Sequence, residues 1–76
     1  MSDLRVKAAL GVAAYLELRN MSKSALAKEI GITRQYLHAM LINRKNITNY
    51  VTQISRVLDV TEWELIKEGH NETAKN

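Results

Sequence analysis

The amino-acid sequence predicts an all-α fold, a compact bundle of five helices in a single domain. Its 76 residues contain no proline and three glycines, and a chain so poor in helix-breaking residues favours helix. Apolar residues recur three and four positions apart along most of the chain, which is the spacing of helices with one buried face. Ser22, Thr33 and Thr61 stand where three of these segments begin, and such residues cap helix N-termini.

The first predicted helix runs from Asp3 to about Arg19 and is rich in alanine, the strongest helix former. Its apolar residues fall on two faces rather than on the usual single stripe. One face carries Ala9, Val12, Ala13 and Leu16, and the other carries Leu10, Ala14 and Leu18. Two interpretations are open: the extra face meets a second subunit, or the other helices of a small domain wrap around it.

Residues 21–46 predict two short helices joined by a tight turn. Ser22 caps the first, from about Lys23 to Ile30, whose apolar face carries Ala25, Leu26 and Ile30. Gly31 ends it, because glycine readily takes the left-handed conformation needed just past a helix. Thr33 caps the second, from about Arg34 to Ile42, whose inward residues are Leu37, Met40 and Leu41. This is the helix-turn-helix pattern, and it indicates DNA binding.

Polar side chains occupy the outer side of the second of these helices. Arg34, Gln35 and His38 share that side and can project into a major groove. Arginine can bind N7 and O6 of guanine, and glutamine can bind N6 and N7 of adenine, so we expect these three residues to read bases. Tyr36 has two interpretations: it contacts the sugar-phosphate backbone, or it lies half-buried against the preceding helix.

Positive charge concentrates on this helix pair and the segment after it. The net charge is zero over residues 1–18, +6 over residues 19–58 and −3 over residues 59–76. Such a basic segment suits a phosphate backbone, and a solvated basic surface explains the charge equally well. The expected backbone contacts are Lys23 at a helix N-terminus, Tyr36, and the loop residues Asn43, Arg44 and Lys45.

A fourth helix is predicted from about Asn49 to Leu58. Thr48 is its expected cap, and Ile47 is expected to pack inward just before it. Val51, Ile54, Val57 and Leu58 form the inward face of this helix.

The last predicted helix begins with a capping box, in which Thr61 and Glu64 each bond the other's backbone N–H. Trp63 follows, and it is expected to be a core anchor or, alternatively, a dimer contact. The chain from Gly69 onward, GHNETAKN, is polar. We therefore place the helix-turn-helix domain at residues 1–68 and expect residues 69–76 to be a disordered polar tail.

The composition also excludes several classes of protein. Without cysteine there are no disulfides, thiolate zinc sites or thiol catalysis, and the chain suits a reducing cytoplasm. His38 and His70 are the only histidines, and no cluster of ligands surrounds them in the sequence, so we expect no metal and no cofactor. The sequence shows no nucleophile–base pair, no carboxylate pair and no phosphate-binding glycine loop, so we do not expect an enzyme. No apolar run approaches the ~20 residues of a membrane span, and the N-terminus has no signal-peptide core.

Two stretches carry a resemblance to a known family: LAKEIGITRQYLHAMLINRKNI and, after it, ISRVLDVTEWEL. They resemble the lambda-repressor/Cro-like (XRE-type) helix-turn-helix domain of phage and bacterial regulators over roughly Met21 to Ile66. The resemblance implies a five-helix domain whose third helix enters the major groove. It gives the same base-reading residues and the same backbone contacts at Lys23 and the loop.

The chain departs from the family pattern at two places. Lys23 stands where the family usually has glutamine, and Leu41 and Ile42 stand where many members have glutamate and arginine before a glycine. No glycine follows the third helix in this chain, so the geometry of the next loop is its own.

Together these observations predict a sequence-specific transcription regulator. We expect a phage or bacterial repressor that binds double-stranded operator DNA as a homodimer, through two half-sites about one helical turn apart. The alternative is a protein-interaction module on the same fold, similar to an antitoxin or an antirepressor, that does not bind DNA. The apolar breadth of the first helix favours the alternative, and the segregated charge favours DNA binding.

Overall fold

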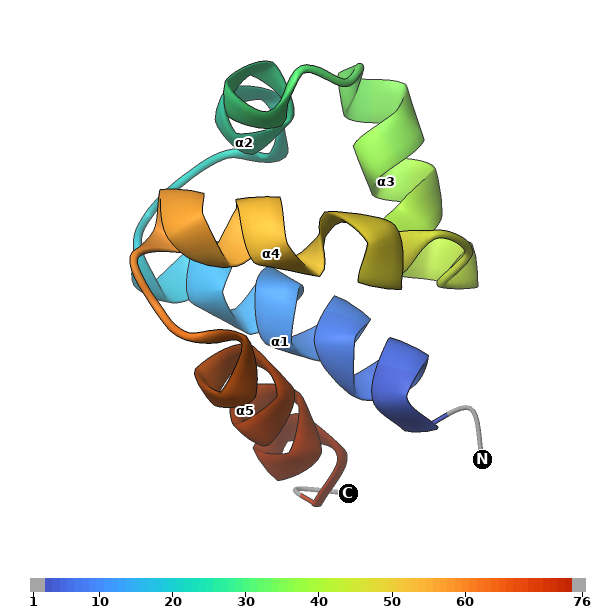
Figure 1. Cartoon of the computed structure of the whole chain (residues 1–76), viewed down its shortest axis with the longest axis vertical. Coiled ribbons are helices and arrows are strands. Elements are labelled where there is room, and N and C mark those ends of the chain that lie inside the picture. Colours follow the sequence, from blue (N-terminus) through green and yellow to red (C-terminus); the bar gives the residue numbers. More distant parts are fainter. Residues whose placement is uncertain (1–2, 75–76) are drawn as a thin grey trace.

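Five helices make up the chain between residues 3 and 74, which is the part that the computed structural model describes, and this part contains no strand (Figure 1). The helices are α1 (Asp3–Leu18), α2 (Lys23–Ile30), α3 (Arg34–Asn43), α4 (Ile47–Leu58) and α5 (Glu62–Ala74). The predicted all-α bundle is confirmed. None of these helices is both long enough and apolar enough to cross a bilayer.

The helices surround one hydrophobic core. In Figure 1, α2 and α3 form one end of the molecule, α4 passes over α1, and α5 lies against α1 at the other end. Every helix contributes apolar side chains to the core, and their removal from water is the main stabilising term. The largest fully buried side chains are Val12, Leu26, Leu37, Met40, Ile47, Ile54, Leu58 and Leu65. Because α2 and α3 are fixed to the core from one side, their far sides face solvent.

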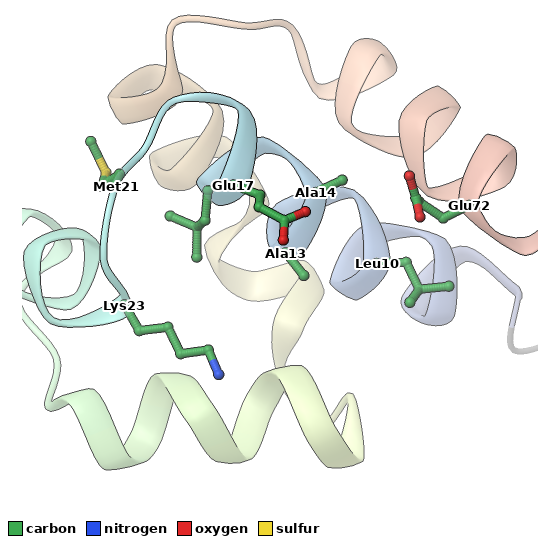
Figure 2. Close-up of a pocket in the computed structure, with 8 residues that line it drawn as sticks. Leu10, Ala13, Ala14, Glu17, Met21, Lys23 and Glu72 are labelled. Carbon is green, nitrogen blue, oxygen red and sulfur yellow. The ribbon is translucent and has the colours of Figure 1, made fainter.

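Of the two apolar faces predicted for α1, the first is buried except at Ala13 and the second is only partly covered. The buried residues are Ala8, Ala9, Val12 and Leu16. Ala13, predicted to lie with them, is exposed. On the second face, Leu10 and Ala14 are half-buried and Leu18 is exposed. A hollow of about 370 Å³ lies on this side of α1, bordered by Glu17, Lys23 and Glu72 (Figure 2). The other helices therefore wrap α1 only in part.

The C-terminal segment is helical where the sequence predicted disorder. α5 continues to Ala74, so residues 69–74 belong to it, and residues 75–76 of the predicted tail lie outside the described part. Gly69 is buried against the backbone of Lys7 on α1, and a Cβ at this position would lie 2.7 Å from the Lys7 Cα. The polar composition misled the prediction because the contact is made by backbone, which a hydropathy pattern cannot report.

The start of α5 is capped as predicted, but its tryptophan does not lie in the core. Thr61 N–H donates to Glu64 Oε1 over 2.7 Å, and Glu64 N–H donates to Thr61 Oγ1 over 3.0 Å, which confirms the capping box. In α5, Leu65 faces the core and Trp63 faces away from it. Trp63 is 69% exposed, so its prediction as a core anchor is wrong.

α4 begins earlier than predicted. Ile47 is its first residue and is fully buried, which confirms its inward packing. The N-cap is Asn46, in the left-handed region with φ 63°, and its side chain makes no capping hydrogen bond. Thr48 lies inside the first turn, so its prediction as the cap is wrong. The loop after α3 is short enough that Asn46 must turn the chain directly into the helix.

Candidate nucleic-acid interface

Local hydrogen bonds cap the N-termini of α2 and α3, and Gly31 forms the turn between them, as the sequence predicted. Ser22 Oγ accepts from the N–H of Ala25 over 3.0 Å, and Thr33 Oγ1 accepts from the N–H of Tyr36 over 3.0 Å. Gly31 sits in the left-handed region with φ 78° and ends α2. The two helices are thus held by their caps as well as by the core.

The inner face of α2 differs from the prediction at two positions, Ala25 and Ala27, and the inner face of α3 agrees with it. On α2 the buried residues are Leu26 and Ala27, whereas Ala25 is exposed, so its assignment to the inner face is wrong. On α3, Leu37 and Met40 are buried and Leu41 packs against the core at half-burial. These contacts set the rotation of α3 about its axis, and that rotation decides which side chains face outward.

The outward side of α3 carries the three residues predicted to read bases. Arg34, Gln35 and His38 are all exposed, and the helical period places them on one stripe. A helix of this length is about 15 Å long, and B-DNA has a major groove roughly 12 Å wide and 8.5 Å deep, so α3 can enter it end-on or along its length. The structure brings these three residues together.

Ile42 belongs to the same stripe, and the sequence prediction missed it. Ile42 is 62% exposed and follows His38 by one turn of α3. An exposed aliphatic side chain beside polar groove-facing residues can contact the methyl group of thymine. Its spacing of four from His38 and eight from Arg34 is the signal that places it on this stripe, although its apolar character favours an inward position.

Lys23 and His38 contact each other across the gap between α2 and α3. Lys23 Nζ lies 3.1 Å from His38 Nδ1, although the two residues are 15 positions apart in the sequence. Lys23 is half-buried, and Figure 2 shows its side chain extending from the start of α2 toward α3. One predicted backbone contact and one predicted base-reading residue therefore form a pair, which the sequence did not predict.

Tyr36 is directed toward α4 and the loop that precedes it. Its hydroxyl accepts from Asn46 Nδ2 over 3.1 Å, and its ring meets the Tyr50 ring edge-on, with centroids 6.0 Å apart. These partners are not on α2, where one of the two interpretations placed it. Tyr36 is 38% exposed, so its hydroxyl remains at the surface with its own O–H able to donate.

In the loop after α3, residues with long or polar side chains stand where the family pattern has a glycine. Asn43 is the last residue of α3, and its Oδ1 accepts from the N–H of Lys45 over 2.8 Å. Arg44 takes the left-handed position with φ 63°, and its N–H donates to the carbonyl of Met40 over 2.8 Å. Lys45 is exposed at the tip.

The guanidinium of Arg44 is a candidate anion contact. Its Nε is buried, and no hydrogen-bond partner for it occurs among the described residues. A buried donor without a partner costs free energy, and the guanidinium to which it belongs is a charged group that can donate to a phosphate oxygen.

Not every cation of the basic segment is directed at this surface. Arg19 Nε donates to the carbonyl of Leu58 at the end of α4 over 3.0 Å, and its guanidinium lies 5.4 Å from the centre of the Tyr15 ring. This arginine therefore stabilises the junction of α1 and α4. Helix α5, which has Glu62 and Glu64 in its first turn, lies at the other end of the molecule from α2 and α3 in Figure 1.

The chemistry available at this surface is hydrogen-bond donation to anions and base edges. The described residues contain no group of three or more histidine, aspartate or glutamate side chains that could hold a metal ion. The exposed groups of α3 and its loop are a guanidinium, an amide, an imidazole, a phenol and an ammonium. Such a set matches the acceptors of a phosphate backbone and a major groove.

Comparison with known proteins identifies the same region as a helix-turn-helix. A family model described as helix-turn-helix matches residues 12–62, which is more than half of the chain and includes α2 and α3 whole. Neither the curated proteins nor the solved structures gave a match.

Proposed function

The chain belongs to the lambda-repressor-like (XRE-type) helix-turn-helix family of DNA-binding transcription regulators, and from that premise we propose that it is a repressor of phage or bacterial type that binds operator DNA as a homodimer. The observation that carries the proposal is the single stripe of exposed hydrogen-bonding side chains on α3. Fold alone does not fix function, so the residues of this stripe are what the proposal depends on.

Base reading is assigned to Arg34, Gln35 and His38. Arg34 stands at the first position of α3, directly after the Thr33 cap, where a long side chain reaches beyond the helix end. A bidentate arginine–guanine or glutamine–adenine pair discriminates by about 1–3 kcal/mol against the wrong base. These residues therefore carry sequence preference rather than general affinity.

Backbone binding is assigned to Lys23, Tyr36, Asn43, Arg44 and Lys45. The support is strongest at Arg44, whose buried Nε lacks a partner, and at Lys45, which is exposed at the loop tip. Asn43 contributes mainly through the loop conformation, since its side-chain carbonyl already accepts from Lys45 N–H. Phosphate contacts of this kind hold the protein in register and do not depend on base sequence.

The dimensions of the domain suit two copies on one face of DNA. Its principal extents are 30 × 23 × 20 Å, and adjacent half-sites on one face of B-DNA are about 34 Å apart. Two copies can therefore occupy neighbouring turns without overlapping. A pair bound in this way covers the DNA over both half-sites and excludes polymerase from overlapping sequence, which is the proposed mode of repression.

Selection of bound sequences from random DNA tests the proposal. The wild-type protein is expected to select two symmetric half-sites about 10 base pairs apart. Arg34→Ala and Gln35→Ala should each lose preference at one position of the half-site. Arg56→Ala and Gln53→Ala are matched controls, because they remove the same guanidinium and amide groups from exposed positions on α4.

Three results would contradict parts of the proposal. If Arg34→Ala and Gln35→Ala retain both affinity and preference, the assignment of the α3 stripe is wrong. Selection of a single asymmetric site would contradict the dimer. If no salt-sensitive binding to any DNA occurs, the protein-interaction alternative takes the place of the regulator.

A further inference from the structure

The contact between Lys23 and His38 determines which hydrogen-bonding groups His38 can present. An ammonium group carries three donors and no acceptor, so Lys23 Nζ can only donate in this contact. His38 Nδ1, 3.1 Å away, must therefore be the acceptor and carry no hydrogen. A neutral imidazole has one hydrogen, which is then on Nε2.

The position of Lys23 makes this contact directional. Its side chain is half-buried at the edge of the hollow on α1, and it points toward α3 (Figure 2). His38 is exposed on the outward stripe, so Nδ1 faces back toward α2 and Nε2 is the ring nitrogen left for another molecule. The lysine thus orients the ring as well as selecting its tautomer.

We propose that Lys23 is a positioning residue: by donating to Nδ1 it holds His38 as an Nε2–H donor and so restricts His38 to base edges that accept a hydrogen bond. This inference rests on the proposed function and names the base class that His38 reads. Guanine is the best match, because its N7 and O6 are both acceptors in the major groove, and cytosine is the worst, because it presents the N4 amino donor.

The first test observes the imidazole without DNA. In long-range proton–nitrogen correlation spectra, recorded at a pH where the imidazole is neutral, His38 Nδ1 should lack a hydrogen and Nε2 should carry one. Lys23→Met should move the His38 signals toward those of His70, which is exposed on α5. Lys23→Arg restores a donor-only cation and should restore the wild-type signals.

A matched control separates the hydrogen bond from the loss of charge. Lys28→Met removes a positive charge from the same helix at an exposed position, and it should leave the His38 signals unchanged. A hydrogen on Nδ1 in the wild-type protein overturns the proposal. So does a Lys23→Met spectrum identical to that of the wild type.

The second test measures base preference. The position read by His38 is the one at which His38→Ala loses preference, and wild type should prefer guanine there over the inverted pair by roughly tenfold, the effect of about 1.4 kcal/mol. Lys23→Met should reduce this ratio several-fold. Lys28→Met should weaken binding to both sequences equally.

The outcomes distinguish this inference from the proposed function. Sequence-specific binding with cytosine preferred at the His38 position, or with the ratio unchanged in Lys23→Met, overturns the inference and leaves the regulator intact. Absence of DNA binding overturns the proposed function and the reading role of His38 together. The spectra of the protein alone still decide in that case whether Lys23 sets the tautomer.

Discussion

Gly69→Ala is expected to destabilise the protein, although alanine is the better helix former. In an exposed helix interior this change gains about 1 kcal/mol. At position 69 the new Cβ would lie 2.7 Å from the Cα of Lys7 and closer still to its carbonyl group, whereas real Cβ contacts essentially never fall below 3.0 Å. Both clashing groups are backbone, so no side-chain rotation relieves the overlap.

The magnitude follows from what must move. α5 has to separate from α1 along their contact, and forced overpacking of this kind costs about 1–3 kcal/mol, with more where backbone must shift. Because backbone must shift, the upper part of that range applies, about 2–3 kcal/mol, and the gain of about 1 kcal/mol in helix propensity leaves a net loss of about 1–2 kcal/mol. For a domain of this size that lowers the melting temperature by roughly 5–15 °C. Urea and thermal denaturation followed by circular dichroism measure both quantities.

The control and a second variant make the prediction specific. Asn71→Ala, at an exposed position two residues further on α5, should be neutral or slightly stabilising. Gly11→Ala places a Cβ 2.9 Å from the carbonyl carbon of Leu65 in the same helix contact, so the double variant should lose less than the sum of the two single losses. If Gly69→Ala is as stable as Asn71→Ala, α5 is not docked at Gly69, and the disordered tail expected from the sequence is correct.

Three further outcomes are expected. Arg44→Gly removes left-handed strain at φ 63°, so the free energy of unfolding should stay the same or rise by up to about 1 kcal/mol. The affinity for DNA should fall, and the slope of its salt dependence should drop by about 0.9. Clear destabilisation with unchanged affinity would contradict the assignment of Arg44 to a phosphate contact. Lys45→Ala should weaken binding similarly on all DNA sequences and lower the slope of the salt dependence by about one unit in a titration with salt. The control Lys67→Ala on α5 should change neither quantity. A change in base preference in Lys45→Ala would contradict the assignment of Lys45 to the DNA backbone. Trp63→Ala should change the free energy of unfolding by less than about 0.5 kcal/mol, since the side chain is 69% exposed; a loss of several kcal/mol in urea denaturation would show that it is buried in an assembly.

The features that could be predicted from the sequence are those that neighbouring residues determine. Ser22, Thr33 and the Thr61–Glu64 pair cap helices through bonds within three residues, and Gly31 ends α2 through its own backbone freedom. The stripe of α3 was likewise predictable, because a helical period and two buried residues define its outward side.

The features that were missed depend on the arrangement of helices. Trp63 and Leu65 are two apolar residues at the start of α5, and only the docking of α5 on α1 decides which of them is buried. Gly69 falls in the predicted polar tail because its role, a backbone contact with α1, leaves no apolar signal in the sequence. The pairing of Lys23 with His38 depends on the angle between α2 and α3, which no local pattern specifies.

The loop after α3 shows how this chain manages without the glycine that its family pattern has there. Arg44 and Asn46 both adopt left-handed backbone, which costs about 1–2 kcal/mol for an ordinary residue and less for asparagine. Two side-chain bonds hold the conformation: Asn43 with the N–H of Lys45, and Asn46 with the hydroxyl of Tyr36. Glycine would ease the backbone but would remove a cation whose Nε has no partner within the described residues. Strain that persists at such a position points to function, and here the function that it favours is a phosphate contact beside the α3 stripe.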